Sequence, residues 1–339
     1  MRHLTIIDIA REANVSIKTV SRVLNQEKGV GSTTRARVQA IIDAHGFKPN
    51  AAARSLPGSR SYLIGLMIFN ENVHYYYNAL QTGVMRAARQ LGYHMIMEPM
   101  RGEEPEDRQV VMKRLRSSRF DAMIVPPPMC DNPEILDMLE ELDIPYVRIA
   151  PRIQLERSSY IYMNDSDAAY DIMTHLWELG HRQILYVGFK VTGASLDRYD
   201  GYTRFFRDQG RVPPYPLIEV DEATTHGAIE TGEGIMQWDD RPTAIFGASD
   251  MIAFGMITAA AKHDLSLPGD MSIVGFDDSP GAESVWPPLT TIRQPISDMG
   301  EQAVDILVKA LGGNLATKTK EARKLDYALI IRGTTAAPR

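Results

Sequence analysis

The 339-residue sequence predicts an α/β protein in three parts: a head of three helices, a hinge helix, and a two-lobed core of doubly wound parallel sheets. Three observations predict this architecture. Residues 4–45 carry apolar side chains at helical spacing, interrupted by capping and turn residues. From Tyr62 onward, short apolar runs alternate with amphipathic helical segments in two series of similar length. Charge separates near the same boundary, because residues 1–60 hold ten Lys and Arg against four Asp and Glu.

The predicted head begins with two short helices within residues 4–25. Thr5 is a suitable N-cap for the first helix, because its hydroxyl can accept a hydrogen bond from an unpaired backbone N–H. Asp8, three residues later, completes a pair that resembles a capping box. A turn at Ala13 and Asn14 follows, and Ser16 is placed to cap the second helix. The spacing therefore predicts two capped helices in close succession.

The second helix is predicted to have one apolar and one polar face. Val20, Val23 and Leu24 face inward at helical spacing. The opposite face carries Ile17, Lys18, Ser21 and Arg22. A helix, a short turn and a polar-faced helix form the helix-turn-helix motif, whose second helix enters the DNA major groove. The alternative is an ordinary helical hairpin packed onto the rest of the protein.

The charge distribution favours the DNA-binding interpretation. Residues 1–60 carry a net charge of +6, and the whole chain carries −6, so residues 61–339 carry −12. A basic head on an acidic body is typical of a phosphate-binding module attached to a part that does not touch DNA. A hairpin with a purely structural role would not explain why positive charge is concentrated in residues 1–60.

A third amphipathic helix is predicted over residues 33–45, with Val38, Ile41 and Ile42 inward and Gly46 as its C-cap. Residues 51–56 can form a short hinge helix that Asn50 caps and a Pro-Gly pair ends. So short a helix is not stable alone in water, so we expect it to fold when docked on DNA or a partner. Leu56 is then either a plain linker residue or a wedge inserted between base steps.

The body reads as alternating strands and helices in two series. Apolar runs such as SYLIGLMIF and DAMIVPPP in the first series, and QILYVGF and MSIVGFDD in the second, are typical of buried parallel strands. Two βαβ series of similar length predict two doubly wound lobes. Ligands in such folds bind outside the carboxyl ends of the strands, which here means the cleft between the lobes.

Several classes of function lack their motifs. Neither GxGxxG nor GxxxxGK[ST] occurs, nor do HExxH, GxSxG or a Cys/His cluster at zinc spacing. We therefore expect no cofactor, no metal and no catalytic residues, and interpret His175 and His181 as surface or capping residues. The single cysteine, Cys130, fits a reducing compartment. No signal peptide or membrane span is visible, which predicts a cytoplasmic protein without a membrane partner.

Two charged residues have the chemistry of ligand groups. Asp277 ends the apolar run SIVGFD, where its carboxylate can accept two hydrogen bonds from vicinal hydroxyls. The alternative for Asp277 is a cap or turn residue, a role that suits Asp278 better. Arg198 is interpreted as beginning a helix, where a cation opposes the helix dipole, so it needs a polar ligand or a partner carboxylate. Asp250 is predicted to cap the helix that starts at Met251.

The string TIIDIAREANVSIKTVSRVLN, continued by TRARVQAIIDAHGFKPNAAARSL, resembles the DNA-binding head and hinge of the LacI/GalR family of bacterial transcription regulators. The resemblance implies that Ile17, Lys18 and Arg22 read bases. An isoleucine cannot hydrogen-bond a base edge, so Ile17 would read a thymine methyl group or shape. Residues expected to contact phosphates, frame the motif or act from the hinge are Thr5, Ser16, Thr19, Ser21, Asn25, Asn50, Arg54 and Leu56.

The resemblance continues through the body, where HLWELGHRQILYVG, RYDGYTRFF and VWPPLTTIRQP are specific strings. It implies a core like that of a periplasmic sugar-binding protein. By this resemblance Arg198 and Asp277 form an effector-binding pair and Ser249 is a further polar contact. Tyr76 and Tyr77 match aromatic residues that face the cleft, with ordinary core packing as the alternative.

Two residues do not follow the pattern of sugar-responsive members. Where some have an acidic residue after the strand IPYVRI, this chain has Ala150, with Arg148 nearby. In the cleft, Arg148 would favour a negatively charged ligand; otherwise it is buried against Asp or Glu. Trp286 is either a core anchor or a ligand platform.

The sequence thus predicts a DNA-binding regulator that is controlled by a small metabolite such as a sugar. Repression is the commoner arrangement for such a regulator, so we expect a repressor. Its partners would be a pseudo-palindromic operator in double-stranded DNA, a carbohydrate effector and a second copy of the chain. The expected parts are a head (1–48), a hinge (49–60) and a core (61–339), with one lobe at 61–163 and 293–323 and the other at 164–292 and 324–339. The alternatives are a nucleobase- or nucleoside-responsive regulator, or a two-lobed enzyme with an incidental helical head.

Overall fold

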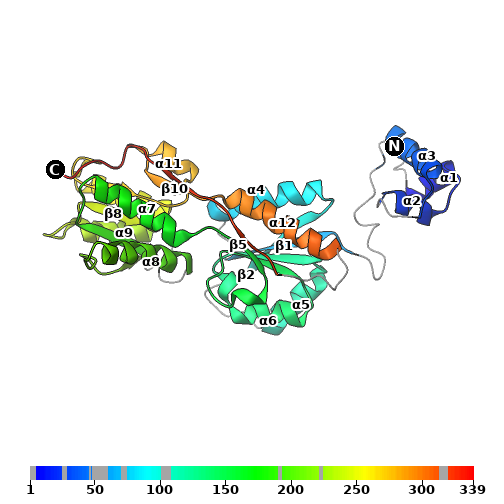
Figure 1. The fold of residues 1–339 in the computed structure, drawn as a ribbon, viewed down its shortest axis with the longest axis horizontal. Helices are drawn as coiled ribbons and strands as arrows, with labels where there is room; N and C mark the ends of the chain where they lie inside the picture. The colour runs from blue at the N-terminus through cyan, green and yellow to red at the C-terminus, as the bar shows by residue number, and fades with distance from the viewer. Residues whose placement is uncertain are drawn as a thin grey trace. The chain divides into compact units, whose positions relative to one another are not determined.

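The computed structural model describes residues 5–24, 29–45, 47, 60–69, 75–100, 108–189, 193–220, 224–312 and 320–339. The chain divides into two compact units, Met1–Tyr62 and Leu63–Arg339 (Figure 1). The expected hinge helix over residues 51–56 lies outside the described residues, as do Asn25, Asn50, Arg54 and Leu56.

The first unit holds the three predicted helices, α1 (Ile6–Glu12), α2 (Ile17–Leu24) and α3 (Ser32–Ala44). Their apolar faces form one small core, made of Ile9, Ala10, Ala13, Val20, Val23, Val38 and Ile42. The predicted capping box of α1 is confirmed, since Thr5 and Asp8 each accept a hydrogen bond from the other's backbone N–H. The turn after α1 includes Asn14 in the left-handed conformation, at φ +50°.

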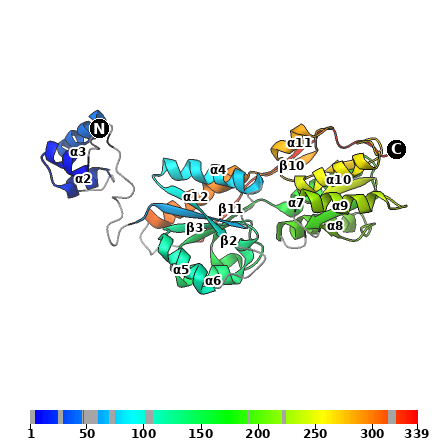
Figure 2. The same ribbon diagram turned by 180° about the vertical axis from the view of Figure 1, so that it is seen from behind.

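The described part of the second unit contains two parallel sheets and one antiparallel strand pair, and the first sheet has six parallel strands in the order β11-β5-β4-β3-β1-β2. The strands are β1 (Leu63–Phe69), β2 (His94–Met100), β3 (Ala122–Val125), β4 (Tyr146–Ile149), β5 (Ser159–Tyr162) and β11 (Ala322–Lys324). The helices of this lobe are α4 (Tyr75–Gln90), α5 (Arg108–Ser118), α6 (Pro133–Glu141) and α12 (Ile296–Gly312). Helices α4 and α12 cover one face of the sheet, and α5 and α6 cover the other (Figures 1 and 2). Two short 3₁₀ turns, η2 (Met129–Asp131) and η3 (Leu155–Arg157), lie in its loops.

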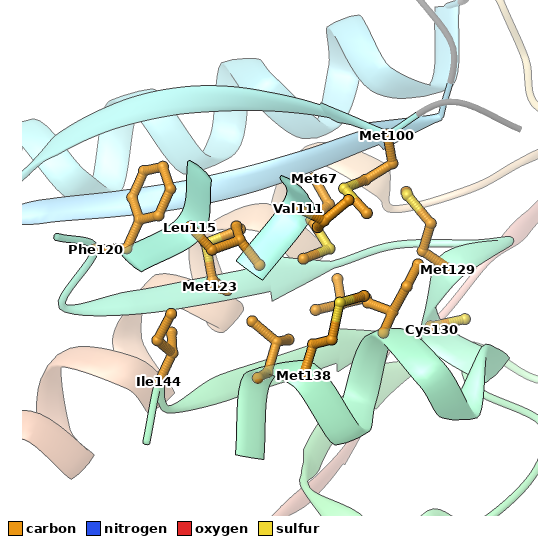
Figure 3. Packing of buried hydrophobic residues seen from close by; sticks show 13 residues of the cluster. Met67, Met100, Val111, Leu115, Phe120, Met123, Met129, Cys130, Met138 and Ile144 are labelled. Atoms are coloured by element: carbon orange, nitrogen blue, oxygen red, sulfur yellow. The ribbon is translucent and has the colours of Figure 1, made fainter. Parts of the chain in front are cut away.

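The core between the sheet and α5 and α6 is rich in sulfur. Five of its thirteen buried residues are methionines, and Cys130 lies at one end (Figure 3). Methionine side chains fill irregular gaps because they are unbranched and polarisable. Cys130 is a buried free thiol, and burial raises its pKa well above the usual value. It is therefore a packing residue.

The second sheet is a parallel sheet in the order β7-β6-β8-β9. Its strands are β6 (Ile184–Phe189), β7 (Ile218–Val220), β8 (Ala244–Gly247) and β9 (Ser272–Val274). The helices are α7 (Asp165–Glu178), α8 (Gly193–Asp208), α9 (Thr225–Met236), α10 (Asp250–Lys262) and the short α11 (Pro280–Ser284). An antiparallel pair, β10 (Thr291–Arg293) with β12 (Ala328–Ile330), completes the lobe.

Three segments connect the lobes: β5 to α7, β10 to α12, and β11 to β12. The predicted fold class, a helix-turn-helix head followed by a two-lobed core of parallel sheets, is confirmed. Within the described ranges, no helix is long and apolar enough to cross a membrane.

Candidate functional sites

Helix α2 has the two faces that the sequence predicts. Val20 and Val23 are buried in the head core, whereas Ile17 is 47% exposed and Lys18 is also exposed. Ser21 and Arg22 are half-buried. An aliphatic side chain held in solvent on a polar helix face has no packing role there, so Ile17 is available to contact a partner.

Three of the residues expected to contact phosphates or frame the motif also hold the helix ends. The Thr5 hydroxyl donates to Asp8 Oδ2 over 2.7 Å at the start of α1. At the start of α2, the Ser16 hydroxyl accepts from the Thr19 N–H at 3.1 Å and lies 2.9 Å from the Thr19 hydroxyl. These contacts fix the position of the recognition helix, which is the framing part of their expected role.

The second candidate site lies in the two-lobed core and begins with Arg198. This side chain is only 7% exposed, and its Nε donates to Asp165 Oδ1 at 2.8 Å. It also donates through Nη1 to the carbonyl of Ala248, and its guanidinium carbon lies 3.6 Å from the centroid of the Phe276 ring. No described residue accepts a hydrogen bond from Nη2. The partner carboxylate that the sequence called for is therefore Asp165.

The expectation that Arg198 begins a helix is wrong. Helix α8 starts at Gly193, five residues earlier, so Arg198 lies in its second turn. The helix dipole therefore does not explain the position of Arg198, because the dipole acts within the first turn. Asp165 at the start of α7 explains it, since a buried guanidinium needs a buried carboxylate.

Asp277 follows β9 in a left-handed conformation, at φ +134°. Its Oδ1 accepts from Gln294 Nε2 at 2.6 Å. Burial, followed by the nearby carboxylate of Asp250, raises the pKa of Asp277 to about 7, against the opposing effects of Arg198 and Gln294. Hydrogen-bond donors on a ligand would therefore stabilise the charged form of Asp277.

Asp250 does not cap α10, which is a correction of the sequence analysis. The cap is Ser249, whose hydroxyl accepts from the Ile252 N–H at 3.3 Å. Asp250 is buried and accepts from the Ser279 N–H at 2.7 Å, and from the hydroxyls of Ser279 and Thr291 at 2.8 and 2.6 Å. Its carboxylate thus supports the loop that carries Asp277. Ser249, expected as a ligand contact, already uses its side-chain oxygen as a cap.

Of the two roles expected for Asp278, a cap or a turn residue, the turn residue is the correct one. It stands in the left-handed turn conformation at φ +53°, but it caps no helix. Its carboxylate is held by Arg293 Nε and Arg332 Nη2, each at 2.6 Å. It therefore ties β10 and the C-terminal segment to the loop.

The first lobe contributes tyrosines from the start of α4. Tyr77 is 6% exposed, and its hydroxyl donates to the Pro127 carbonyl at 2.8 Å and accepts from the Phe69 N–H at 3.2 Å. The core-packing alternative is therefore the correct one for Tyr77, because its polar atom is already satisfied inside the lobe.

Tyr76 and Tyr75 are half-buried and approach the second lobe. The pKa of Tyr76 is raised by burial first, then by groups that include Asp165, and is lowered by Arg198. The Tyr75 hydroxyl donates to the Asp278 carbonyl at 3.4 Å, and burial followed by Asp277 raises its pKa. Sequence reasoning missed Tyr75; its place beside two further tyrosines was the available signal.

Arg148 is not a ligand residue. It is fully buried, and Nε donates to the Ser158 hydroxyl at 2.9 Å. The other nitrogens donate to the carbonyls of Cys130, Ile153 and Gln154. Its partners are three backbone carbonyls and a hydroxyl, not the Asp or Glu that the sequence suggested, and they use four of its five N–H donors.

Trp286 is 87% exposed, so it is not a core anchor. The expectation of a ligand platform stays a prediction.

One further contact joins the lobes beside this site. Arg152, in the loop after β4, places Nε 2.8 Å from Asp197 and Nη2 2.5 Å from Asp200, both on α8. The backbone N–H groups of Arg152 and Ile153 donate to the Asp131 carboxylate, which fixes the loop. The helix that carries Arg198 is thus tied to the first lobe.

The chemistry of the core site is that of a receptor for hydroxyl groups. Arg198 is paired with Asp165 and lies near Asp277, so the site offers carboxyl oxygens to hydrogen-bond donors and has no uncompensated cation for an anion. Among the described residues, no group of three or more His, Cys, Asp or Glu could hold a metal ion.

Fold and site together define a two-lobed ligand-binding protein that carries a helix-turn-helix head. Residues 5–50 match the family described as bacterial regulatory proteins, lacI family, and residues 173–335 match the periplasmic binding protein-like domain. The chain therefore carries a DNA-binding domain of the lacI family, followed by a periplasmic binding protein-like domain.

Full-length relatives support this assignment. Catabolite control protein A of Priestia megaterium is 28% identical, over 98% of this chain and 99% of its own length. The HTH-type transcriptional repressor PurR of Vibrio vulnificus is 29% identical, over 97% and 98%. Among solved structures, the lac repressor dimer bound to operator and the anti-inducer ONPF has a TM-score of 0.79 at 25% identity, covering 99% of this chain and 100% of its own. The CelR–cellobiose complex has a TM-score of 0.74 at 23% identity, over 98% and 100%.

Proposed function

We propose that the protein is a DNA-binding transcriptional repressor whose operator affinity is controlled by a small, uncharged, hydroxyl-rich effector, a sugar or sugar derivative. The observation that carries the effector class is the buried set of Arg198, Asp165 and Asp277 opposite Tyr76. Carboxylates accept hydrogen bonds from hydroxyls, and aromatic faces stack on sugar rings. Two similar structures contain bound cellobiose and bound ribose, respectively. Its place of action would be the cytoplasm, and we propose no catalytic activity.

Operator recognition is proposed for a homodimer on a pseudo-palindromic site, as in the dimer structure of the lac repressor. In each half-site Lys18 and Arg22 would contact guanine acceptors, and Ile17 would contact a thymine methyl group. The proposed wedge residue, Leu56, supports a bent DNA complex.

The test of DNA reading uses an operator selected from randomised duplexes. Arg22→Ala should cost about 1–3 kcal/mol of binding and relax specificity at one symmetric pair of positions. The control is Arg37→Ala, which removes the same charge from the exposed surface of α3. Equal weakening on every base substitution would instead make Arg22 a phosphate contact. Leu56→Ala should lower affinity and DNA bending while the head stays folded.

The test of the effector class is a thermal-shift screen of neutral sugars, sugar acids and nucleosides with the full-length protein. A ligand at 100 times its dissociation constant should add about 2.7 kcal/mol of stability. We expect a neutral sugar to stabilise and sugar acids to fail, because the arginine of the site, Arg198, is already paired with Asp165. Stabilisation by a sugar acid alone would contradict the assignment.

Variants of the site then separate ligand binding from DNA binding. Asp277→Ala and Tyr76→Ala should lose the ligand response and keep operator binding, while Asp239→Ala, an exposed control, should keep both. Arg198→Ala should also lose the response, but it leaves Asp165 buried without its partner, so it must be read with a stability measurement.

A nucleobase or nucleoside is the second candidate effector. Aromatic rings at Tyr75 and Tyr76 can stack on a base as well as on a sugar. The similarity to PurR favours the same alternative. Stabilisation by nucleosides and not by sugars in the screen would select it.

A further inference from the structure

The second lobe is strongly acidic, yet its few cations are unevenly placed. Residues 164–292 contain eight Lys and Arg against twenty Asp and Glu. Three of the eight, Arg182, Arg207 and Arg211, line one surface hollow of about 720 Å³. Its other lining residues are Gln183, Phe206, Gly210, Val212 and Pro214. Like charges repel, so this grouping is unfavourable unless an anion binds between them.

The hollow lies at the opposite end of the sheet from the effector site. Arg182 and Gln183 directly precede β6, and Phe206 to Arg211 span the end of α8 and the loop after it. Ala248 and Asp277, by contrast, follow the carboxyl ends of β8 and β9. Because the strands are parallel, these two groups of residues belong to opposite edges of the sheet.

The positive charges of these three arginines are poorly balanced by carboxylates of the protein. Arg182 stacks on Trp177, with its guanidinium carbon 3.6 Å from the ring centroid, and donates only to the carbonyls of Trp177 and His181. Arg211 is exposed and lies 5.7 Å from the same ring. Arg207 is 77% exposed at its side chain, and its nearest carboxylate, Asp208, is 4.0 Å from Nε. Within the described ranges, no carboxylate makes a hydrogen bond to these three side chains.

Helix-dipole compensation does not explain the whole cluster. A cation near the end of α8 is favourable there, and Arg207 is so placed. Arg182 belongs to a different segment, before β6, and its side chain turns to the Trp177 ring beside Arg211. Guanidinium groups from two segments meeting at one hollow are suited to bind phosphate oxygens in pairs.

We propose that this hollow is a second, independent binding site for a small phosphorylated metabolite, held by Arg182, Arg207 and Arg211. It stands apart from the proposed effector site and does not depend on it. A phosphate group would contact the guanidinium groups, while Val212 and Pro214 border the uncharged part of the ligand.

The experiment is a calorimetric titration of the full-length protein with inorganic pyrophosphate at low ionic strength. A second readout is the fluorescence of Trp177 in a Trp238→Phe, Trp286→Phe background, because two of the arginines lie on its ring. The test variant is Arg207→Gln, Arg211→Gln, which changes two exposed side chains. Its control is Arg89→Gln, Lys113→Gln, which removes the same charge from the exposed surface of the first lobe.

We expect pyrophosphate to bind and to change the Trp177 emission. Affinity should fall at least about tenfold in the Arg207/Arg211 variant and stay within about twofold in the control and in Asp277→Ala. The proposal is overturned if pyrophosphate does not bind the unchanged protein. It is equally overturned if both double variants lose affinity alike, which would show a general charge effect, or if Asp277→Ala abolishes binding, which would place the anion in the cleft.

Discussion

At the residue scale, burial decides what each charged side chain of the core can do. Arg198 and Arg148 are both buried, but they differ in their partners. Arg198 donates to one carboxylate and one carbonyl, and no described residue accepts a hydrogen bond from its Nη2. Arg148 donates hydrogen bonds from its three nitrogens to three carbonyls and a hydroxyl. Only the first is therefore equipped to bind something else.

Asp277 gives a prediction about pH. Its folded-state pKa of about 7 lies above the value of about 3.9 for an unfolded aspartate, so the folded protein holds this proton more tightly. The resulting stabilisation is complete below the unfolded pKa and is lost as pH rises through 7. Asp277→Asn should therefore raise the free energy of unfolding by about 1–3 kcal/mol at pH 8, and by clearly less at pH 5, where only the first part of this stabilisation has been lost.

Asp239→Asn is the control for this prediction, because Asp239 is an exposed carboxylate of the same lobe. It should change the melting temperature little at either pH. Equal shifts of Asp277→Asn at pH 5 and pH 8 would contradict the assignment of a raised pKa to Asp277.

Arg148 gives a prediction about stability. Arg148→Met removes a fully buried side chain that donates to the Ser158 hydroxyl and to three backbone carbonyls, so the free energy of unfolding should fall by about 3–5 kcal/mol. Urea unfolding of the full-length protein measures it, with exposed Arg116→Met as the control, expected to lie within about 0.5 kcal/mol of the unchanged protein. A loss below about 1 kcal/mol would mean that Arg148 is not the structural residue its contacts indicate.

At the element scale, the strands and helices could be predicted because their signals are local. Continuous apolar runs identified the buried strands, and Thr5 with Asp8 identified the start of α1. The details of the site depended on neighbours distant in sequence. Tyr76 and Tyr77 differ by one residue on a helix, and the packing of α4 decides which one is buried. Ser249 likewise takes the capping role expected of Asp250, because Ser279 and Thr291 supply donors for Asp250 that no local pattern reveals.

The packing of α4, which carries Tyr75 and Tyr76, depends on glycine. A Cβ at Gly83 would lie 1.8 Å from the Ser297 carbonyl oxygen of α12, and one at Gly300 would lie 2.6 Å from the Leu80 carbonyl oxygen. The two helices therefore meet backbone to backbone, and a methyl group must push them apart.

Gly83→Ala is expected to destabilise the core by about 2–3 kcal/mol or more, because the obstructing atom is backbone and cannot rotate away. Gly234→Ala in α9 is the matched control, since a Cβ there has nothing within 4 Å. The control should stabilise by roughly 0.5–1 kcal/mol, as alanine does at an open helix position. Urea unfolding of both variants checks the pair, and similar effects would mean that α4 and α12 are not in such close contact.

At the scale of the whole molecule, two units with separate cores carry opposite charge. The head core consists of seven buried residues, and the chain around it is basic, whereas the remainder is acidic. A unit of about 60 residues buries a smaller share of its surface than a large one and is only marginally stable. The division at Tyr62 and Leu63 therefore predicts that the two units unfold independently.

Ile9→Ala tests this independence, because Ile9 is fully buried in the head core. The change should cost the head about 2–5 kcal/mol, enough to unfold a marginal unit and abolish operator binding. In calorimetry, the low-temperature transition should disappear or shift, while the main transition of the core and its sugar-dependent shift stay unchanged. Leu80→Ala removes a fully buried side chain of α4. It should lower the main transition of the core and leave the low-temperature transition of the head unchanged. If either variant moves both transitions together, the head and the core unfold as one cooperative unit.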